Sequence, residues 1–506
     1  MPTGSPSLEQ DARKFAVSLE RYRYVVLALF TLLYALGVVR HAANRPLWYD
    51  EIITVISASA PDASTTWKAA QATDASPPLL HLLTHFSMQR FGSSEVAIRL
   101  PAMAGFWVFC LCLFHFVRRR AGIYFAFAAL LMPIATEAYS YAFDARAYGM
   151  VLGLCGLMLV GWQMANDGRS RVLGCVLLAF SMAAALLLQY YAILLYGPLA
   201  GAELYRTRRE RRWNWGVWAA FAAGVAPLVW RMATIRNVVS QFSQTTWSPA
   251  YPEQIVEYWE TMLQHSASFV VAGIAVMALS LLSRPADEDT EMPPELLAHE
   301  VLAAVLFLAI PVMAVGIGIF KTHMFTPRYA LIGLTGILLL VPFITARLSN
   351  GRALAGFLLL SVSILPALFV ALEAPPRENP VEREATLIKA LEQGPVAIPD
   401  GQLYMQMWYY TPEPLKSRLL FLVDYQAAIQ YMGFDAFDVG VISLRPWSSV
   451  TAVSYKDFAT PGREFRLYQN SLRPGWVLAK VVKDGAATQI EQNATIRQLI
   501  RVRLKP

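Results

Sequence analysis

Long apolar runs, separated by short polar segments, recur over the first three quarters of the chain. A run of about 18 or more apolar residues can cross a hydrocarbon core roughly 30 Å thick. One such run would fit a buried helix of a large soluble protein, but a series of them would not. We therefore predict about eleven membrane-spanning helices. They are placed at 24–40, 95–117, 121–138, 148–165, 172–188, 191–205, 214–231, 267–283, 300–320, 329–346 and 353–372.

Composition and charge support the membrane interpretation. Hydrophobic residues make up 56% of the chain, against roughly 45–50% in soluble globular proteins. The net charge of +7 could suggest a nucleic-acid partner. The arginines, however, gather in short loops beside the apolar runs, at 118–120 and 206–212. This is the positive-inside pattern of membrane proteins, so we predict no nucleic-acid partner.

The same charge pattern predicts the topology. Residues 1–23 are expected to be cytoplasmic, and 24–374 to form the transmembrane domain, with a long first outer loop at 41–94. Within that loop we expect two helices lying in the interface plane, one from about residue 49 to residue 60 and one from residue 77 to residue 91. An odd number of spans places the C-terminus outside. For a bacterial protein this means the inner membrane, with the C-terminal part periplasmic or extracellular.

Residues 375–506 differ from the rest because Pro375 and Pro376 end the last apolar run and shorter elements follow. We expect helices at 382–393, 403–410 and 425–432. Strands are expected at 395–399, 419–423, 439–444, 464–468 and 476–482. This alternation predicts a soluble α/β domain. The predicted fold class is thus a polytopic α-helical membrane protein with a C-terminal α/β domain.

Two adjacent carboxylates, Asp50 and Glu51, stand about ten residues beyond the first predicted span, among apolar residues. Ionisable groups at the edge of apolar surface are costly and indicate function in membrane proteins. One carboxylate could act as a general base while its neighbour orients it. The alternative is structural, because acidic residues in the first turn of a helix are favoured by the helix dipole.

Further polar residues are predicted on the same side of the membrane. Arginines at a membrane boundary can hold a phosphate through paired hydrogen bonds, although such arginines also simply reach for water. We take as candidate binding residues Arg146, Arg328, Asp144, Tyr148, Lys321, Tyr329 and His81. His81 and His85 have a spacing that can hold a metal, but no third ligand is near in sequence. We therefore assign no metal residues, and only a divalent cation is left open as a cofactor.

Five segments together resemble one known family. They are LWYDE at 47–51, SPPLLHLL at 76–83, FGSSEVAIRLP at 91–101, YAFDARAY at 141–148 and FTPRY at 325–329. Their order and spacing resemble the superfamily of protein O-mannosyltransferases and aminoarabinose transferases, which are membrane glycosyltransferases of the C-type fold (family 39-like). The resemblance covers roughly residues 24–345. Asp144 departs from the glutamate that many bacterial relatives carry there.

The resemblance implies a reaction and roles for single residues. Members of this superfamily move a sugar from a polyprenyl-phosphate carrier to a hydroxyl of a glycan, lipid or protein on the outer face, usually with inversion. By that likeness Asp50 would be the base, Glu51 its acidic neighbour, and Arg146 and Arg328 ligands of the carrier phosphate. Two alternatives stay open: a transporter or flippase of a lipid-linked substrate, and a catalytically silent member that acts as a binding protein.

Overall fold

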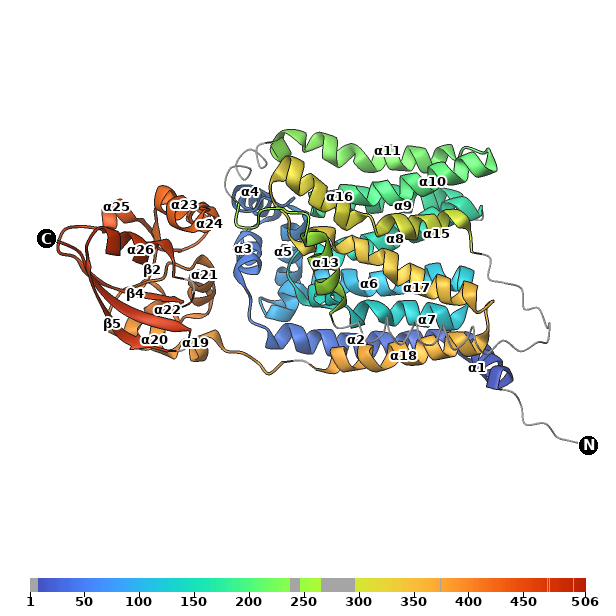
Figure 1. Ribbon diagram of the computed structural model, residues 1–506, viewed down its shortest axis with the longest axis horizontal. Coiled ribbons are helices and arrows are strands. Elements are labelled where there is room, and N and C mark those ends of the chain that lie inside the picture. Colours follow the sequence, from blue (N-terminus) through green and yellow to red (C-terminus); the bar gives the residue numbers. More distant parts are fainter. Residues whose placement is uncertain are drawn as a thin grey trace, which may run out of the picture.

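In the computed structural model, a helical bundle carries a mixed α/β unit at one end (Figure 1). The structure describes residues 8–168, 170–236, 246–264, 296–373, 375–470, 472, 474–494 and 496–506. The predicted span 267–283 lies outside these residues.

The described part of the chain contains 6 helices that are long and apolar enough to cross a membrane. They are α2 (Arg23–Asn44), α6 (Glu95–Ala121), α8 (Tyr148–Asp167), α9 (Arg171–Leu188), Pro327–Leu348 (η5 Pro327–Leu334 with α17 Thr335–Leu348) and α18 (Ala353–Leu372). Two further apolar segments are bent: Ile123–Ala135 with Glu137–Phe143, by 73°, and Ala298–Phe307 with Ile310–Thr322, by 40°. The chain is therefore an integral membrane protein with six to eight such spans among the described residues.

Of the eleven predicted spans, the one at 267–283 is not tested by the described residues, and two others do not appear there as single crossing helices. The predicted span 191–205 is divided into a 3₁₀ helix, η3 (Tyr190–Leu195), and α10 (Tyr196–Glu210), whose last turns are rich in arginine. Helix α11 (Trp215–Trp230) is apolar but only 16 residues long, which is shorter than a usual crossing helix.

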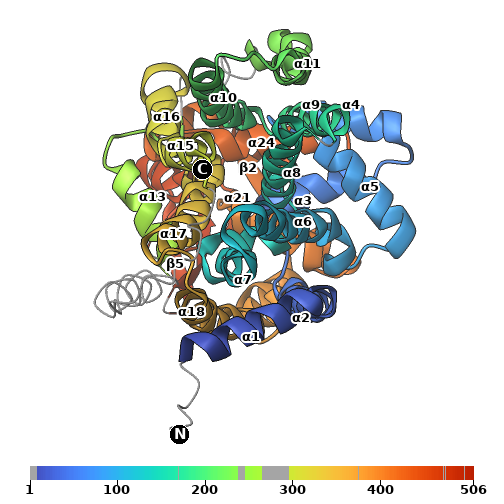
Figure 2. The same ribbon diagram turned by 90° about the vertical axis from the view of Figure 1, so that its right-hand side faces the viewer.

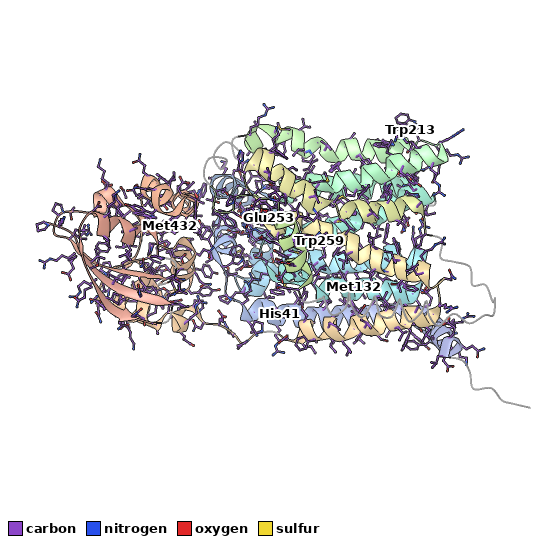
Figure 3. All side chains as sticks on the ribbon, viewed as in Figure 1. His41, Met132, Trp213, Glu253, Trp259 and Met432 are labelled. Atoms are coloured by element: carbon purple, nitrogen blue, oxygen red, sulfur yellow. The ribbon has the colours of Figure 1, made fainter. Side chains whose placement is uncertain are left out.

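The basic loops meet at one end of the bundle. Glu9 of α1 (Leu8–Arg21) accepts hydrogen bonds from the backbone N–H groups of Ala353 and Leu354 at 2.9 and 3.0 Å. Arg118 pairs with Glu20 at 2.7 Å, again joining α6 to the N-terminal helix. Trp213 also lies at this end (Figure 3), as expected of aromatic residues at a membrane–water boundary. The segments that the charge pattern places on one side therefore share one end.

Three short helices cross the opposite end of the bundle. They are α3 (Tyr49–Ala58), α4 (Ala63–Thr73) and α5 (Leu79–Phe91). Viewed along the bundle, α4 and α5 lie to one side of α6 and α8 (Figure 2). The first and third were predicted from the sequence, whereas α4 was not. Asp62 caps the N-terminus of α4, and its side chain accepts a hydrogen bond from the Thr65 N–H.

Helices α6 and α8 pack closely against each other near the end of the bundle that carries α3, α4 and α5. A Cβ at Gly105 of α6, or at Gly149 or Gly153 of α8, would collide with the backbone of the facing helix. Small residues of this kind allow membrane helices to approach closely. The approach sets the position of Arg99, near the start of α6, against the loop 144–147 that precedes α8.

The C-terminal unit is built on a six-stranded sheet of order β3-β2-β1-β4-β6-β5. The strands are β1 (Val396–Ala397), β2 (Leu419–Val423), β3 (Ala452–Ser454), β4 (Glu464–Asn470), β5 (Ala487–Asn493) and β6 (Arg497–Arg503). Neighbours from β3 to β4 are parallel, whereas β4–β6 and β5–β6 are antiparallel. The helices are α19 (Pro380–Arg383), α20 (Ala385–Gln393), α21 (Gly401–Tyr410), α22 (Glu413–Lys416), α23 (Tyr425–Met432), α24 (Ala436–Leu444), α25 (Tyr455–Phe458) and α26 (Trp476–Lys483).

Two strand predictions in this unit are wrong. Residues 439–444 and 476–482 belong to α24 and α26. Each is a short apolar run, and such runs fit either structure in the sequence. In α24 the buried residues are Asp438, Val441 and Leu444, a spacing of three that marks one face of a helix.

Helix α21 packs against α3, so the C-terminal unit covers the end of the bundle. Leu47, Tyr49 and Ile52 share one apolar cluster with residues of α21. The Leu47 N–H donates to the Tyr410 hydroxyl at 2.8 Å, and Gln406 donates to the Leu47 carbonyl at 2.9 Å. The segment just before Asp50 is therefore held by the C-terminal unit.

Candidate active site

The first turn of α3 is anchored by Glu51, whose side chain is fully buried. Arg99 pairs with it through two hydrogen bonds of 2.7 Å each, Nε to Oε1 and Nη2 to Oε2. The backbone N–H groups of Ala145 and Trp48 donate to the same carboxylate at 2.7 and 3.2 Å. Glu51 therefore ties α3 to α6 and to the loop before α8, and its oxygens face the protein interior.

Asp50, the preceding residue, lies beside two arginines. Its Oδ2 accepts a hydrogen bond from Arg328 Nη1 at 3.2 Å and lies 4.0 Å from Arg146 Nε. Among the described residues, none donates a hydrogen bond to the other oxygen, Oδ1. The side chain is 19% exposed. The structure thus presents a carboxylate with two arginines beside one oxygen and, among the described residues, no hydrogen bond to the other.

Arg146 is held from the other side by Asp74, which the sequence analysis did not single out. Arg146 Nη1 lies 2.6 Å from Asp74 Oδ2, and Nη2 donates to Ser76 Oγ at 3.3 Å. Burial tends to raise the pKa of Asp74, but Arg146 and His81 outweigh it and hold the pKa well below its ordinary value. Asp74 stands two residues before the SPPLLHLL segment, and that position was the one signal available in the sequence.

Arg328 is surrounded by aromatic rings. Its guanidinium carbon lies 5.5 Å from the ring centre of Trp48, 6.0 Å from Tyr148 and 5.8 Å from Trp247. Such contacts are attractive and restrict the side chain. Arg328 Nε is buried and has no hydrogen-bond partner among the described residues. An orphaned buried donor calls for an explanation, and an anion bound at this arginine would supply one.

Trp247 is a further residue that the sequence analysis missed. Its loop is joined to the segment before Arg328, because Phe325 N–H donates to the Ser248 carbonyl at 3.1 Å and Pro249 pairs with Met324.

Tyr329, the next candidate, stacks on Tyr191 with ring centres 4.6 Å apart. Only tertiary structure brings residues this distant in sequence to one site.

The remaining candidates lie at different distances from Asp50. Asp144 is buried and accepts a hydrogen bond from Trp48 Nε1 at 2.9 Å. His81 is also buried, with Nε2 3.5 Å from Asp74 Oδ2. Lys321 is exposed on η4 (Gly318–Thr322), and no contact joins it to Asp50 among the described residues. The structure therefore gathers Asp50, Arg146, Arg328, Tyr148 and Tyr329 most closely.

Asp144 gives the site a pH-dependent contribution to stability. Burial, followed by the charge of Glu51, raises its pKa to about 6. The folded protein therefore holds this proton more tightly than the unfolded chain, and the contribution of Asp144 to the free energy of unfolding falls between about pH 4 and pH 6. In the wild type, the free energy of unfolding should therefore fall by on the order of 1–3 kcal/mol as the pH rises from about 4 to about 6. In Asp144→Asn this fall should be absent. Thermal unfolding in detergent from about pH 4.5 to pH 7.5 measures this, and parallel curves for both proteins would contradict it.

The described residues contain no group of three or more His, Cys, Asp and Glu side chains that could hold a metal ion. His85, the partner of His81 in the spacing noted above, has Nδ1 2.8 Å from the Ala58 carbonyl.

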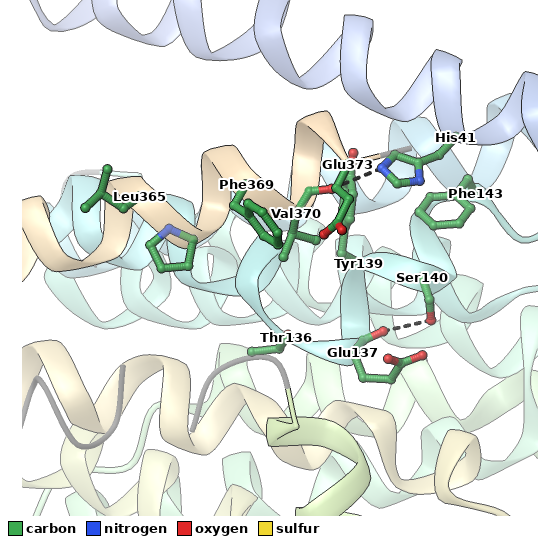
Figure 4. Close-up of a pocket in the computed structure, with 11 residues that line it drawn as sticks. His41, Thr136, Glu137, Tyr139, Ser140, Phe143, Leu365, Phe369, Val370 and Glu373 are labelled. Atoms are coloured by element: carbon green, nitrogen blue, oxygen red, sulfur yellow. Dashed lines mark hydrogen bonds between the residues drawn. The ribbon is translucent and has the colours of Figure 1, made fainter. Parts of the chain in front are cut away.

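A cavity of about 690 Å³ lies between α2, η2 (Glu137–Phe143) and α18 (Figure 4). Its walls combine apolar side chains such as Leu365 and Phe369 with the polar residues His41, Glu137 and Glu373. Asp50, Arg146 and Arg328 do not line it. The connection is through the chain, because η2 runs directly into the loop that carries Asp144 and Arg146.

No protein-family model and no curated protein sequence matches this chain. The fold, however, is similar to that of solved structures. The structure of ArnT from Cupriavidus metallidurans in the apo state is 12% identical, with a TM-score of 0.57, and the match covers 95% of this chain and 98% of ArnT. ArnT bound to undecaprenyl phosphate gives the same identity and coverage and a TM-score of 0.56. The chain therefore shares the overall fold of these two ArnT structures.

Proposed function

We propose that this protein is a membrane glycosyltransferase that moves a sugar from a polyprenyl-phosphate donor to an acceptor hydroxyl. The observation that carries the proposal is the carboxylate of Asp50, which has two arginines beside one oxygen and no hydrogen bond to the other among the described residues. The structure of ArnT bound to undecaprenyl phosphate, which has a similar fold, supports the choice of donor.

The chemistry follows from this geometry. The acceptor hydroxyl attacks the anomeric carbon of the donor sugar from the face opposite the phosphate, so the sugar is transferred with inversion. The bond from that carbon to the phosphate oxygen breaks, and the phosphate leaves with an added negative charge. Asp50 Oδ1 takes the proton from the acceptor. Arg146 and Arg328 stabilise the charge that develops on the leaving phosphate.

The other candidates take supporting roles in this proposal. Glu51 orients α3 and so aims Asp50. Tyr148 and Tyr329 flank Arg328, and Asp144 positions Trp48. We propose less direct roles for His81, behind Asp74, and for Lys321, near the membrane boundary.

The same proposal gives the protein an orientation. The basic end of the bundle faces the cytoplasm, and the end with Asp50 faces the outer side of a bacterial inner membrane. Residues 375–506 then form a periplasmic domain. Because this domain holds the segment before Asp50 through Tyr410 and Gln406, we propose that it also helps to position the acceptor, whether glycan, lipid or protein.

Sugar transfer in proteoliposomes tests the proposal. The donors are a panel of labelled polyprenyl-phosphate sugars, with the matching nucleotide sugars as controls, and the acceptors are envelope extracts. We expect transfer from a lipid-linked donor and none from nucleotide sugars alone. Movement of labelled lipid across the bilayer without a new glycosidic bond would instead favour the transporter or flippase.

Arg328 provides a second test, directed at the carrier. Arg328→Gln is expected to raise the KM for the lipid-linked donor by on the order of tenfold or more, because a charge-assisted hydrogen bond to the phosphate is lost. Arg90→Gln is the matched control, since Arg90 is exposed at the same end of the bundle. Equal donor KM values in the two variants would remove Arg328 from the phosphate site.

A further inference from the structure

The guanidinium of Arg146 lies between the carboxylates of Asp74 and Asp50, and it is closer to Asp74. Its Nη1 is 2.6 Å from Asp74, whereas its Nε is 4.0 Å from Asp50. The second distance is too long for a hydrogen bond. Ser76 Oγ takes a further hydrogen bond from Nη2 at 3.3 Å. The segment 74–76 therefore holds the guanidinium just short of Asp50.

The surroundings of Asp74 suit a fixed anchor. Its side chain is only 8% exposed, and the Ser76 N–H donates to its Oδ1 at 2.8 Å. His81, which is fully buried, lies against it. The carboxylate is therefore ionised, restrained by neighbours and kept from solvent, so its attraction to Arg146 is little screened.

We propose that Asp74 is a positioning residue, which holds Arg146 where it can bind the carrier phosphate without closing on Asp50. The inference rests on the proposed function and adds to it a restraint on the base. An arginine free to move would form a close two-bond pair with Asp50. Such a pair would take up the oxygen that the acceptor proton needs.

The restraint predicts a characteristic kinetic effect. In Asp74→Asn the strongest partner left to Arg146 is Asp50, so kcat should fall on the order of 10- to 100-fold. The donor KM should change much less, because Arg146 keeps its charge inside the site. Asp74→Glu, which restores the carboxylate, should recover part of kcat. Ser76→Ala should lower kcat in the same direction but by a smaller factor.

A double-mutant cycle shows whether Asp74 acts through Arg146. Once Arg146 has been replaced in Arg146→Gln, no guanidinium remains to close on Asp50. Adding Asp74→Asn to that variant should therefore lower kcat little further, whereas effects on independent sites would multiply. The double variant also leaves no unpaired Arg146 in the protein. It should fold even if Asp74→Asn alone is poorly stable, and size-exclusion profiles in detergent monitor this.

Two outcomes would overturn the inference: an unchanged kcat in Asp74→Asn, or factors for Asp74→Asn and Arg146→Gln that multiply in the double variant. Both outcomes presuppose a wild-type protein that transfers sugar from the lipid-linked donor. A wild-type protein without such transfer would instead contradict the proposed function. The two failures are thus distinguished by the wild-type reaction.

Discussion

Asp50→Asn is expected to lower the rate of sugar transfer by about 10²–10⁴-fold, the range that a general base contributes. Asparagine has nearly the same shape but cannot take the acceptor proton. Binding of the carrier should persist or tighten, because Arg328 would no longer pair with a negative charge at 3.2 Å. Initial transfer rates in proteoliposomes and binding of undecaprenyl phosphate to the purified protein measure the two effects separately.

The matched control is Asp62→Asn. Asp62 lies on the same end of the bundle and caps α4, a position that asparagine fills as well as aspartate. Asp62→Asn should therefore leave the rate of sugar transfer unchanged. Equal transfer by Asp50→Asn and wild type would show that Asp50 is not the base. Loss of both transfer and carrier binding would mean that the substitution disturbs the phosphate site instead.

The sequence predicts those parts of the fold that a local pattern specifies. Apolar runs near 24–40, 95–117 and 353–372 correspond to α2, α6 and α18 with small shifts at their ends. Bends are harder, because the break between Ile123–Ala135 and Glu137–Phe143 falls inside the single run predicted at 121–138. Helices α24 and α26 were taken as strands because a short run of apolar residues has no period long enough to distinguish them.

The site was predicted only as far as its motifs reach. Asp50, Arg146 and Arg328 were found because each belongs to a segment with a recognisable order of residues. Arg99 was not singled out although it lies in the segment 91–101, and Asp74 was not singled out either. Arg99 is fully buried and Asp74 nearly so. Their importance arises from partners 48 and 72 positions away, and a single sequence carries no information about such pairs. For the same reason the sequence placed Glu51 beside the base but did not show that Glu51 pairs with Arg99.

Arg99→Met is expected to destabilise the protein by about 3–5 kcal/mol, the cost of leaving a buried charge without its partner. Glu51 and Arg99 are both fully buried and joined by two 2.7 Å hydrogen bonds. Arg99 also donates to the carbonyl groups of Ala42 and Arg45 at 2.6 and 2.7 Å. Unfolding in mixed micelles, followed by helical circular dichroism, measures the change.

Two controls separate the lost pair from the lost side chain. Lys14→Ala removes one partner of an exposed ion pair, with side chains 72% and 55% exposed, and should change stability by about 0–1 kcal/mol. The double variant Glu51→Gln with Arg99→Met removes both charges, so it should be less destabilised than Arg99→Met alone. If the double variant is instead the less stable, the buried charge on Glu51 is not what makes Arg99 necessary. The hydrogen bonds from Arg99 to the end of α2 would then hold α3, and with it Asp50, in place.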